Sequence, residues 1–164
     1  MAKFAGNGLA NEITGTFSDD LIVGNGGDDI LVGGAGNDQI LGGQGNDVIR
    51  GGLGNDFLFG GVGDDRLLGG AGTDFISGDK GADILNGGAG ADTFAVQVSG
   101  AYLGTGVDTI EDFAVGVDLL AIEGGVEENF SFASAGSNVN VSYNGVLVVV
   151  LQDITLPQDT SLFF

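Results

Sequence analysis

One nine-residue pattern recurs without a gap from Gly15 to Ala95, and it restricts the possible fold more than any other feature. In all nine copies position 1 is Gly and position 6 is Asp, position 8 is always apolar, and position 4 is Gly except at Ser18. The copies read GTFSDDLIV, GNGGDDILV, GGAGNDQIL, GGQGNDVIR, GGLGNDFLF, GGVGDDRLL, GGAGTDFIS, GDKGADILN and GGAGADTFA. Because nine residues cannot enclose a core, the copies must stack, which predicts a solenoid.

Each copy divides into a glycine-rich half that favours turns and a short half that favours a strand. Side chains alternate along a strand, so position 8 is expected to point inward and positions 7 and 9 outward. Two copies return the chain to its starting side, which predicts an all-β fold: a parallel solenoid of two sheets with short strands. The expected core residues are Ile22, Leu31, Ile40, Ile49, Leu58, Leu67, Ile76, Leu85 and Phe94. Residues 6–14, GNGLANEIT, form a degenerate tenth copy with Asn11 in place of Asp and Ile13 at position 8.

The 164-residue chain has a net charge of −19, because 23 acidic residues face only four basic ones. Its hydrophobic content of 43% is too high for a disordered acidic tail. The scarcity of Lys and Arg makes nucleic acids and anionic membranes poor partners. The absence of Cys and His excludes disulfides, thiol nucleophiles and His-based zinc or triad chemistry. No segment has the apolar length of a membrane span, and MAKFAGNG lacks the apolar run of a secretory signal peptide.

Copies two apart share an edge of such a solenoid, so the Asp residues at position 6 form two columns. One column contains Asp20, Asp38, Asp56, Asp74 and Asp92, and the other contains Asp29, Asp47, Asp65 and Asp83. With coils about 4.8 Å apart, two unpaired carboxylates repel by roughly 3.5 kcal/mol at an effective dielectric constant of about 20. A hard dication between them reverses the effect, and turn carbonyls complete an oxygen shell that suits Ca²⁺ better than Mg²⁺. Asx turns are the alternative, but they do not explain two unbroken columns.

These copies resemble the G-G-x-G-x-D-x-U-x repeats of RTX proteins, the haemolysin-type calcium-binding β-roll, over residues 15–95. The resemblance implies that each ion is held by two Asp residues from adjacent coils, by the carbonyls of positions 2 and 4 of the first turn, and by those of positions 1 and 3 of the second. On the edge that contains Asp20, the implied carbonyl ligands are, site by site, Thr16, Ser18, Gly33 and Ala35; Gly34, Gly36, Gly51 and Leu53; Gly52, Gly54, Gly69 and Ala71; and Gly70, Gly72, Gly87 and Ala89. On the other edge they are Asn25, Gly27, Gly42 and Gln44; Gly43, Gly45, Gly60 and Val62; and Gly61, Gly63, Gly78 and Lys80.

This ligand scheme predicts four ions on the first edge and three on the second. Seven Ca²⁺ ions add 14 positive charges to the net charge of −19, which leaves −5. An eighth, weaker site pairs Asn11 with Asp29, since a neutral ligand there lowers the affinity.

The nine-residue period ends after Ala95. Residues 106–122, GVDTIEDFAVGVDLLAI, resemble the segment that follows the β-roll in serralysin-type proteins. The acids Asp108, Asp112 and Asp118 are expected either to bind one further calcium ion at the end of the solenoid or to be loop acids at strand ends. Further on, NVNVSYNGVLVVVL predicts a hairpin that turns at Asn144-Gly145. We expect an N-terminal cap at 1–14, the calcium-binding β-roll at 15–95 and a capping β region at 96–164 that protects the last sheet edge.

The final residues, DTSLFF, resemble the uncleaved signals that direct RTX proteins to the type I secretion apparatus, although a last edge strand reads similarly. The resemblance implies that the chain leaves the cell unfolded and is folded outside by extracellular calcium. The expected location is therefore extracellular or at the cell surface.

The sequence does not predict an enzyme, because H-E-x-x-H is impossible without His and no G-x-S-x-G motif occurs. The outward positions place Leu41, Phe57, Phe59 and Phe75 together on one sheet, an apolar patch typical of an interface unless the C-terminal region covers it. Two functions are compatible with these features. One is an extracellular structural protein that self-associates into a filament, matrix or surface layer once calcium folds it. The other is a calcium-dependent folding and secretion module of a larger exoenzyme or toxin.

Overall fold

The computed structural model describes residues 1–98, 106–124 and 130–154, and the regular structure in these ranges consists of strands alone. In chain order the strands are β1 (Ala2–Ala5), β2 (Glu12–Thr14), β3 (Asp20–Gly26), β4 (Ile30–Ala35), β5 (Gln39–Gln44), β6 (Val48–Leu53), β7 (Phe57–Val62), β8 (Arg66–Ala71), β9 (Phe75–Lys80), β10 (Ile84–Ala89), β11 (Thr93–Gln97), β12 (Asp108–Ile110), β13 (Leu119–Glu123), β14 (Phe130–Ala135), β15 (Asn138–Tyr143) and β16 (Val146–Leu151).

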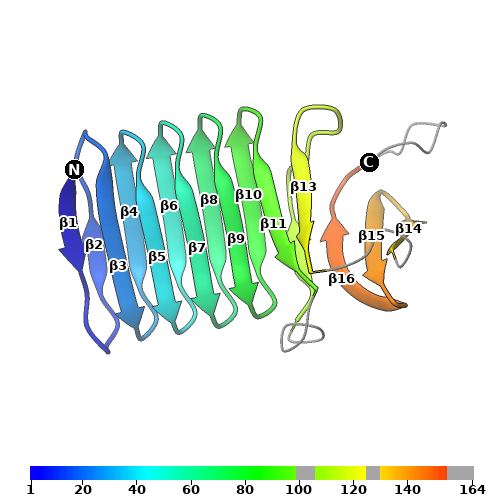
Figure 1. The fold of residues 1–164 in the computed structure, drawn as a ribbon, viewed down its shortest axis with the longest axis horizontal. Helices are drawn as coiled ribbons and strands as arrows, with labels where there is room; N and C mark the ends of the chain where they lie inside the picture. Colours follow the sequence, from blue (N-terminus) through cyan, green and yellow to red (C-terminus); the bar gives the residue numbers. More distant parts are fainter. Residues whose placement is uncertain (99–105, 125–129, 155–164) are drawn as a thin grey trace.

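The strands stack along one axis into a two-sheet solenoid (Figure 1). Sheet A is parallel and has the order β1-β3-β5-β7-β9-β11-β13, whereas sheet B has the order β2-β4-β6-β8-β10-β12-β16-β15-β14. The register is that of the repeat: Ile40 pairs with Leu58, and Leu58 pairs with Ile76 one coil further on. Two copies therefore form one coil, and the predicted parallel β solenoid is confirmed.

The core is a row of position 8 side chains between the two sheets. All nine of these residues, from Ile22 to Phe94, have no exposed surface. Burying a Leu, Ile or Phe side chain stabilises a fold by about 1.5–3 kcal/mol relative to leaving it in water. Because the row continues from coil to coil, each coil depends on its neighbours for its core.

The strands are longer than the three residues that the pattern predicts. For example, β7 runs through the first three positions of the following copy, and Gly61 in β7 pairs with Gly43 in β5. The turn is correspondingly confined to positions 4–6. The turn begins at a glycine with positive φ, as at Gly54 with φ of 119°, a conformation that residues with a Cβ rarely adopt.

The C-terminal strands extend both sheets at one end of the solenoid. β12 pairs in parallel with β10, and β13 pairs in parallel with β11. β16 then pairs with β12, and β14, β15 and β16 form an antiparallel meander that covers this edge of sheet B. The predicted hairpin turn is present at Asn144 and Gly145, which both have positive φ (51° and 77°).

One sequence feature lies outside this description. The DTSLFF segment belongs to residues beyond 154, which are not among the described ranges. Within residues 1–98, 106–124 and 130–154, no helix has the length and apolar character that crossing a membrane requires.

Candidate metal centre

The Asp residues at position 6 form two buried columns, one along each edge of the solenoid. None of the nine side chains is more than 2% exposed. Within a column the backbone N–H of one Asp donates to Oδ1 of the Asp one coil further on, as from Asp38 to Asp56 at 2.7 Å. The same bond joins Asp20 to Asp38, Asp29 to Asp47, Asp47 to Asp65, Asp56 to Asp74, Asp65 to Asp83 and Asp74 to Asp92. The structure therefore brings these Asp residues together in the pairs that the sequence predicts.

The second carboxylate oxygen, Oδ2, carries the evidence for a cation. It is buried without a hydrogen-bond partner in seven residues: Asp29, Asp38, Asp47, Asp56, Asp65, Asp74 and Asp83. Oδ2 of Asp56 and the carbonyl oxygen of Gly69 both lie against Cα of Gly51, in the space that a side chain at this position would fill. An unpaired buried anionic oxygen is costly, and a carboxylate beside carbonyl oxygens is the donor set that Ca²⁺ takes. These residues fit a calcium ion.

At the column ends the equivalent oxygen is satisfied within its own turn. Oδ2 of Asp20 accepts the N–H of Thr16 at 2.7 Å and its hydroxyl at 2.8 Å. Oδ2 of Asp118 accepts the N–H of Ala114 at 2.7 Å, and Oδ1 of Asn11 accepts an N–H from the same turn. At the ends the carboxylate oxygen is thus satisfied by the N–H of the residue four positions earlier, whereas the interior Asp residues keep an oxygen for another partner.

The backbone at position 2 explains this difference. Throughout the interior copies this position has positive φ, including the non-glycine residues Asn25 (77°) and Asp79 (68°), types that tolerate the left-handed region. Thr16 does not have positive φ, and its N–H reaches Asp20. Glycine at position 2 therefore keeps the backbone donor away from the Asp oxygen that a cation would use.

Burial makes the columns resist ionisation when no cation is present. It raises the pKa of Asp47 and Asp56 to about 6 and the pKa of Asp65 to about 7, although the N–H donor from the neighbouring coil lowers each pKa and neighbouring carboxylates raise it. At Asp20 burial also raises the pKa, but the Thr16 hydroxyl and the N–H groups of Ala2 and Thr16 outweigh it and leave the pKa below its usual value. The interior carboxylates therefore gain more from a neutralising partner than Asp20 does.

The expected carbonyl ligands lie at the close contacts between adjacent turns. The carbonyl of Gly34 abuts Cα of Gly52, and the carbonyl of Gly36 abuts Cα of Gly54, so these positions require glycine. The position 3 carbonyl of Leu53 accepts the N–H of Gly36 at 2.9 Å. Equivalent bonds run to the carbonyls of Val62, Ala71, Lys80 and Ala89. Each position 3 carbonyl thus has one lone pair engaged and one available to a ligand.

A second hydrogen-bond ladder, not predicted from the Asp pattern, runs along position 5. Oδ1 of Asn37 accepts the N–H of Asn55, one coil further on, at 2.8 Å. The ladder also uses the side chains of Asp19, Asp28, Asn46, Asn55 and Asp64 as acceptors. The sequence contains the signal, because position 5 is Asp or Asn in the first six copies and then becomes Thr73, Ala82 and Ala91. These exposed side chains stabilise the turns.

Asp108 and Asp118 continue the two columns beyond the repeats. The N–H of Asp83 donates to Oδ1 of Asp108 at 3.1 Å, and the N–H of Asp92 donates to Oδ1 of Asp118 at 2.9 Å. The segments GVDTIE and GVDLLA place Gly, Asp and an apolar residue at the spacing of positions 4, 6 and 8. This half-repeat identifies Asp108 and Asp118 as equivalents of the position 6 residues. A search for complete nine-residue copies does not find it, because the first half of the pattern is missing.

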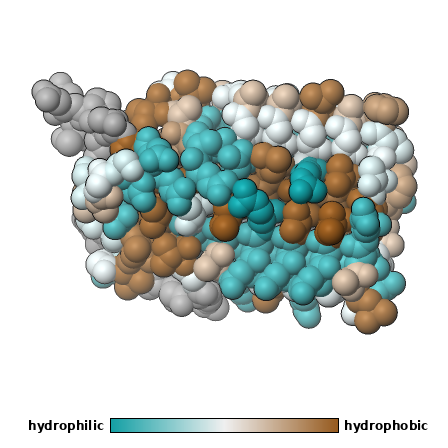
Figure 2. Space-filling model, turned by 180° about the vertical axis from the view of Figure 1, so that it is seen from behind, coloured by the Kyte–Doolittle hydropathy of each residue, from teal (hydrophilic) through white to brown (hydrophobic). Residues whose placement is uncertain are grey.

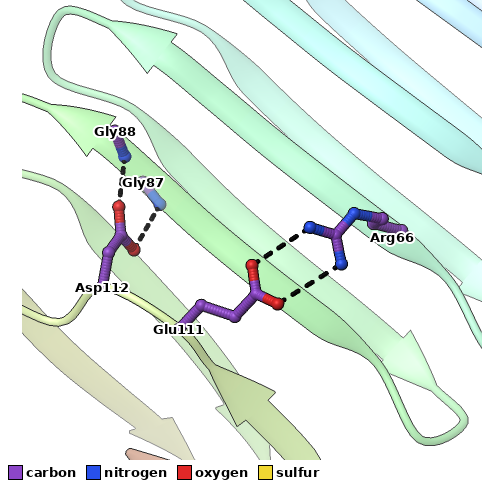
Figure 3. Close-up of polar contacts among 5 residues, drawn as sticks. All are labelled: Arg66, Gly87, Gly88, Glu111 and Asp112. Carbon is purple, nitrogen blue, oxygen red and sulfur yellow. Dashed lines mark hydrogen bonds and ion pairs between the residues drawn. The ribbon is translucent and has the colours of Figure 1, made fainter. Parts of the chain in front are cut away.

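Asp112 has a different role, which corrects the expectation of one site shared by three acids. Its carboxylate accepts the N–H groups of Gly87 and Gly88 at 2.9 and 2.7 Å, close to the ion pair between Glu111 and Arg66 (Figure 3). Asp108 and Asp118 lie in different columns, because they pair with Asp83 and Asp92 respectively. In the described parts of the chain no group of three acidic residues is arranged to hold one ion.

The aromatic patch lies on the outer side of sheet A. The Phe75 ring centroid is 6.0 Å from that of Phe57 and 5.8 Å from that of Phe59, and Leu41 pairs with Phe59 in the sheet. Phe57 is 53% exposed. The described C-terminal strands extend the ends of the sheets and leave Phe57 uncovered. From behind, the surface shows hydrophobic residues beside a continuous hydrophilic band along one edge (Figure 2).

Comparisons with known proteins agree with the repeat. Four copies of a family model described as the RTX calcium-binding nonapeptide repeat match residues 5–40, 33–67, 41–76 and 59–94, so they span 90 of the 164 residues. No curated protein matches the chain in sequence.

Two solved structures are similar to this chain at low sequence identity. One is the extracellular lipase LipA from Serratia marcescens, with 18% identity and a TM-score of 0.40 over 95% of this chain and 38% of the lipase chain. The other is the AlgE6R3 subunit of the Azotobacter vinelandii mannuronan C5-epimerase, with 23% identity and a TM-score of 0.34 over 95% of this chain and 83% of that chain. The chain thus spans well under half of the lipase. By its repeats, the chain belongs to the RTX calcium-binding nonapeptide repeat family.

Proposed function

We propose that this chain is a secreted, non-enzymatic protein that Ca²⁺ folds outside the cell and that then associates with copies of itself. The observation that carries the calcium part is the set of seven buried Oδ2 atoms without a hydrogen-bond partner. Seven such atoms support about seven ions, and their 14 positive charges offset most of the net charge of −19.

Folding and binding are coupled because the two columns form only in the stacked solenoid. Asp38 and Asp56 are 18 residues apart in the sequence, so the unfolded chain does not hold them together. In the folded chain the N–H of Asp38 donates to the carboxylate of Asp56. A bound Ca²⁺ ion supplies the positive charge that such a column lacks, and it accepts the carboxylate and carbonyl oxygens as ligands in a flexible geometry. Since the ion binds the folded state, binding free energy becomes folding free energy.

Circular dichroism of the purified chain tests this coupling. We expect little β signal in a chelating buffer and cooperative recovery when Ca²⁺ is added, with Mg²⁺ at the same concentration much less effective. Equal β signal in excess chelator and in Ca²⁺ would refute calcium-driven folding.

Secretion follows from the same coupling. Low cytosolic calcium keeps the chain unfolded, which is the state that a type I channel accepts, and extracellular calcium then folds it. Expression with and without a type I exporter, followed by immunoblotting of the medium, tests this step. Removal of residues 159–164 should abolish export, and undiminished export would contradict it.

The exposed aromatic patch of Leu41, Phe57, Phe59 and Phe75 supports the structural role. Phe57 remains 53% exposed although the ring of Phe75, on the neighbouring strand, lies 6.0 Å from its own, and exposed apolar groups of this kind mark interaction surfaces. Self-association through this outer face of sheet A would produce a filament or layer only after calcium folds the sheet.

Electron microscopy with and without Ca²⁺, on the wild type and two variants, tests self-association. We expect assemblies for the wild type in Ca²⁺ and their loss in Phe57→Ser. Leu53→Ser is the control, because Leu53 is more exposed than Phe57, at 62%, but lies at position 3, beside the turn. Discrete monomers of the wild type at high concentration would instead favour a folding and secretion module of a larger exoenzyme.

A further inference from the structure

The first coil of the solenoid, formed by β1 and β2, leaves the edges of both sheets open. In the described ranges no strand pairs with the outer side of β1 in sheet A or of β2 in sheet B, so the two sheets end at the same coil (Figure 1). At the other end sheet B, with nine strands against seven in sheet A, continues past β13. An unpaired edge is a template for pairing with another strand, and only the first coil offers two such edges at one level.

The backbone directions show which groups are open. In the interior the N–H of the position 7 residue donates to the preceding coil, as from Phe57 to the Asp38 carbonyl and from Ile30 to the Asn11 carbonyl, both at 2.8 Å. Backbone groups alternate in direction along a strand, so those of position 9 point the same way. In the first coil the equivalent groups point away from the solenoid, and they belong to Lys3, Ala5, Glu12 and Thr14.

The core row is open at the same end. Phe4 pairs with Ile22 in sheet A, and this places it in line with the position 8 residues. Ile13 pairs with Leu31 in sheet B and is in line with the same row. Ile22 and Leu31 have no exposed surface, whereas the residues of the first coil are only partly buried. A further strand on each edge would complete the burial of this row.

The first coil also lacks the charge that would repel a second copy. Residues 1–18 contain one basic and one acidic side chain, Lys3 and Glu12, which cancel in a chain whose net charge is −19. Position 6 is occupied by Ala2, which pairs with Asp20, and by Asn11, whose Oδ1 accepts an N–H from its own turn. An end-to-end contact here therefore brings no column carboxylates together.

We propose that the first coil binds the first coil of a second copy, with β1 pairing with β1 and β2 pairing with β2 in antiparallel fashion. A two-fold axis perpendicular to the sheets returns each sheet to itself with its strands reversed, so both sheets continue through the junction. Phe4 and Ile13 of the two copies then close a common core. A second copy fits because it presents two open edges with the same separation.

The inference rests on the proposed self-association and adds a second contact to it. An aromatic patch that meets the same patch on another copy closes a pair and cannot extend further. The contact between first coils joins such pairs, and the two contacts in alternation produce a filament.

Sedimentation analysis in Ca²⁺ tests the end contact in Phe57→Ser, which lacks the centre of the aromatic patch. We expect a dimer for Phe57→Ser and a monomer for Phe57→Ser/Thr14→Pro, because Pro removes an outward N–H and places its ring at the open edge. Retained β signal in circular dichroism controls for folding. A monomeric Phe57→Ser, or a dimer that survives Thr14→Pro, would overturn the end contact. If Phe57→Ser is monomeric while the wild type assembles, only this inference fails; if the wild type is also monomeric, the proposed self-association fails as well.

Cysteine cross-linking covers the case in which the proline variant does not fold. The chain has no Cys, so one introduced Cys reports one contact. Across the two-fold axis Ile13 faces its own equivalent as a non-hydrogen-bonded pair, with Cα atoms about 4.5 Å apart, which a disulfide can bridge. We expect Phe57→Ser/Ile13→Cys to form a covalent dimer under oxidising conditions in Ca²⁺ but not in chelator.

The matched control is Phe57→Ser/Leu53→Cys, because Leu53 is 62% exposed and lies far along the chain from the first coil. This chain should remain monomeric under the same conditions. Absence of a calcium-dependent dimer in the Ile13→Cys chain, or equal cross-linking of the control, would overturn the proposal.

Discussion

The N–H of Asp47 donates to Oδ1 of Asp65 at 2.7 Å, while Oδ2 of the same Asp65 is buried without any partner. The two oxygens of this carboxylate therefore have different roles. Its first oxygen fixes the spacing of two coils, and its second oxygen is buried where no hydrogen-bond donor of the protein reaches it. This division allows the role of each oxygen to be tested separately.

Asp65→Asn should lower calcium affinity much more than Asp64→Asn, although each variant removes one negative charge. The amide that Asp65→Asn introduces keeps an acceptor for the N–H of Asp47 but replaces the anionic oxygen. Asp64 is exposed at position 5, where Asn already occurs in neighbouring copies. Calcium titrations followed by circular dichroism should show a clearly higher midpoint for Asp65→Asn only. Similar midpoints for the two variants would show that net charge, not column geometry, controls binding.

Gly51→Ala should weaken calcium binding, whereas Gly26→Ala should leave it nearly unchanged. A Cβ at Gly51 would collide with Oδ2 of Asp56 and with the Gly69 carbonyl, the two groups that line the cation space. A Cβ at Gly26 has no neighbour closer than 3.6 Å. Isothermal titration calorimetry of both variants checks this difference. If Gly51→Ala binds calcium with the same isotherm as the wild type, the ion does not lie beside Gly51.

The period itself predicts the solenoid, its two sheets and its core, because a strict repeat forces equivalent residues into equivalent places. It also predicts the Asp pairs, since position 6 recurs at every coil. The difference between Asp20 and Asp56 is not predicted, because it depends on φ at position 2. Thr16 turns its N–H toward the carboxylate, whereas glycine does not.

The two Asp columns continue beyond the repeats, and this is the second feature that the nine-residue period does not predict. Asp108 and Asp118 are in register with Asp83 and Asp92 in space, but the intervening chain is longer than one coil. Sheet pairing through β12 and β13, not sequence spacing, sets their positions. Sequence spacing alone therefore groups these acids with Asp112, whose carboxylate instead accepts the N–H groups of Gly87 and Gly88.

Leu58→Ala should destabilise the calcium-bound chain by about 3 kcal/mol, because a fully buried Leu is replaced and a cavity remains. Leu53→Ala, the same substitution at a side chain that is 62% exposed, should change stability by less than about 0.5 kcal/mol. Urea unfolding at saturating Ca²⁺ measures both. Comparable losses for the two variants would contradict the assignment of position 8 to the core.

Lowering the pH should stabilise the calcium-free fold. In the folded chain burial raises the pKa of Asp65 to about 7 and the pKa of Asp47 and Asp56 to about 6, above the ordinary value of 3.8. Between these values the folded state binds more protons than the unfolded state. Stability therefore rises as the pH falls through about 7 and is lost as the pH rises again.

The same protons compete with calcium, so the pH effect should reverse when the ion is present. In chelating buffer we expect more β signal at about pH 5 than at about pH 8, whereas in limiting Ca²⁺ the midpoint should shift to higher calcium at about pH 5. Both conditions stay above the isoelectric point of 4.1, where precipitation would obscure the signal. An apo chain that loses β signal as the pH falls would mean that the column carboxylates are stabilised as anions by the fold itself, and the need for a cation would disappear.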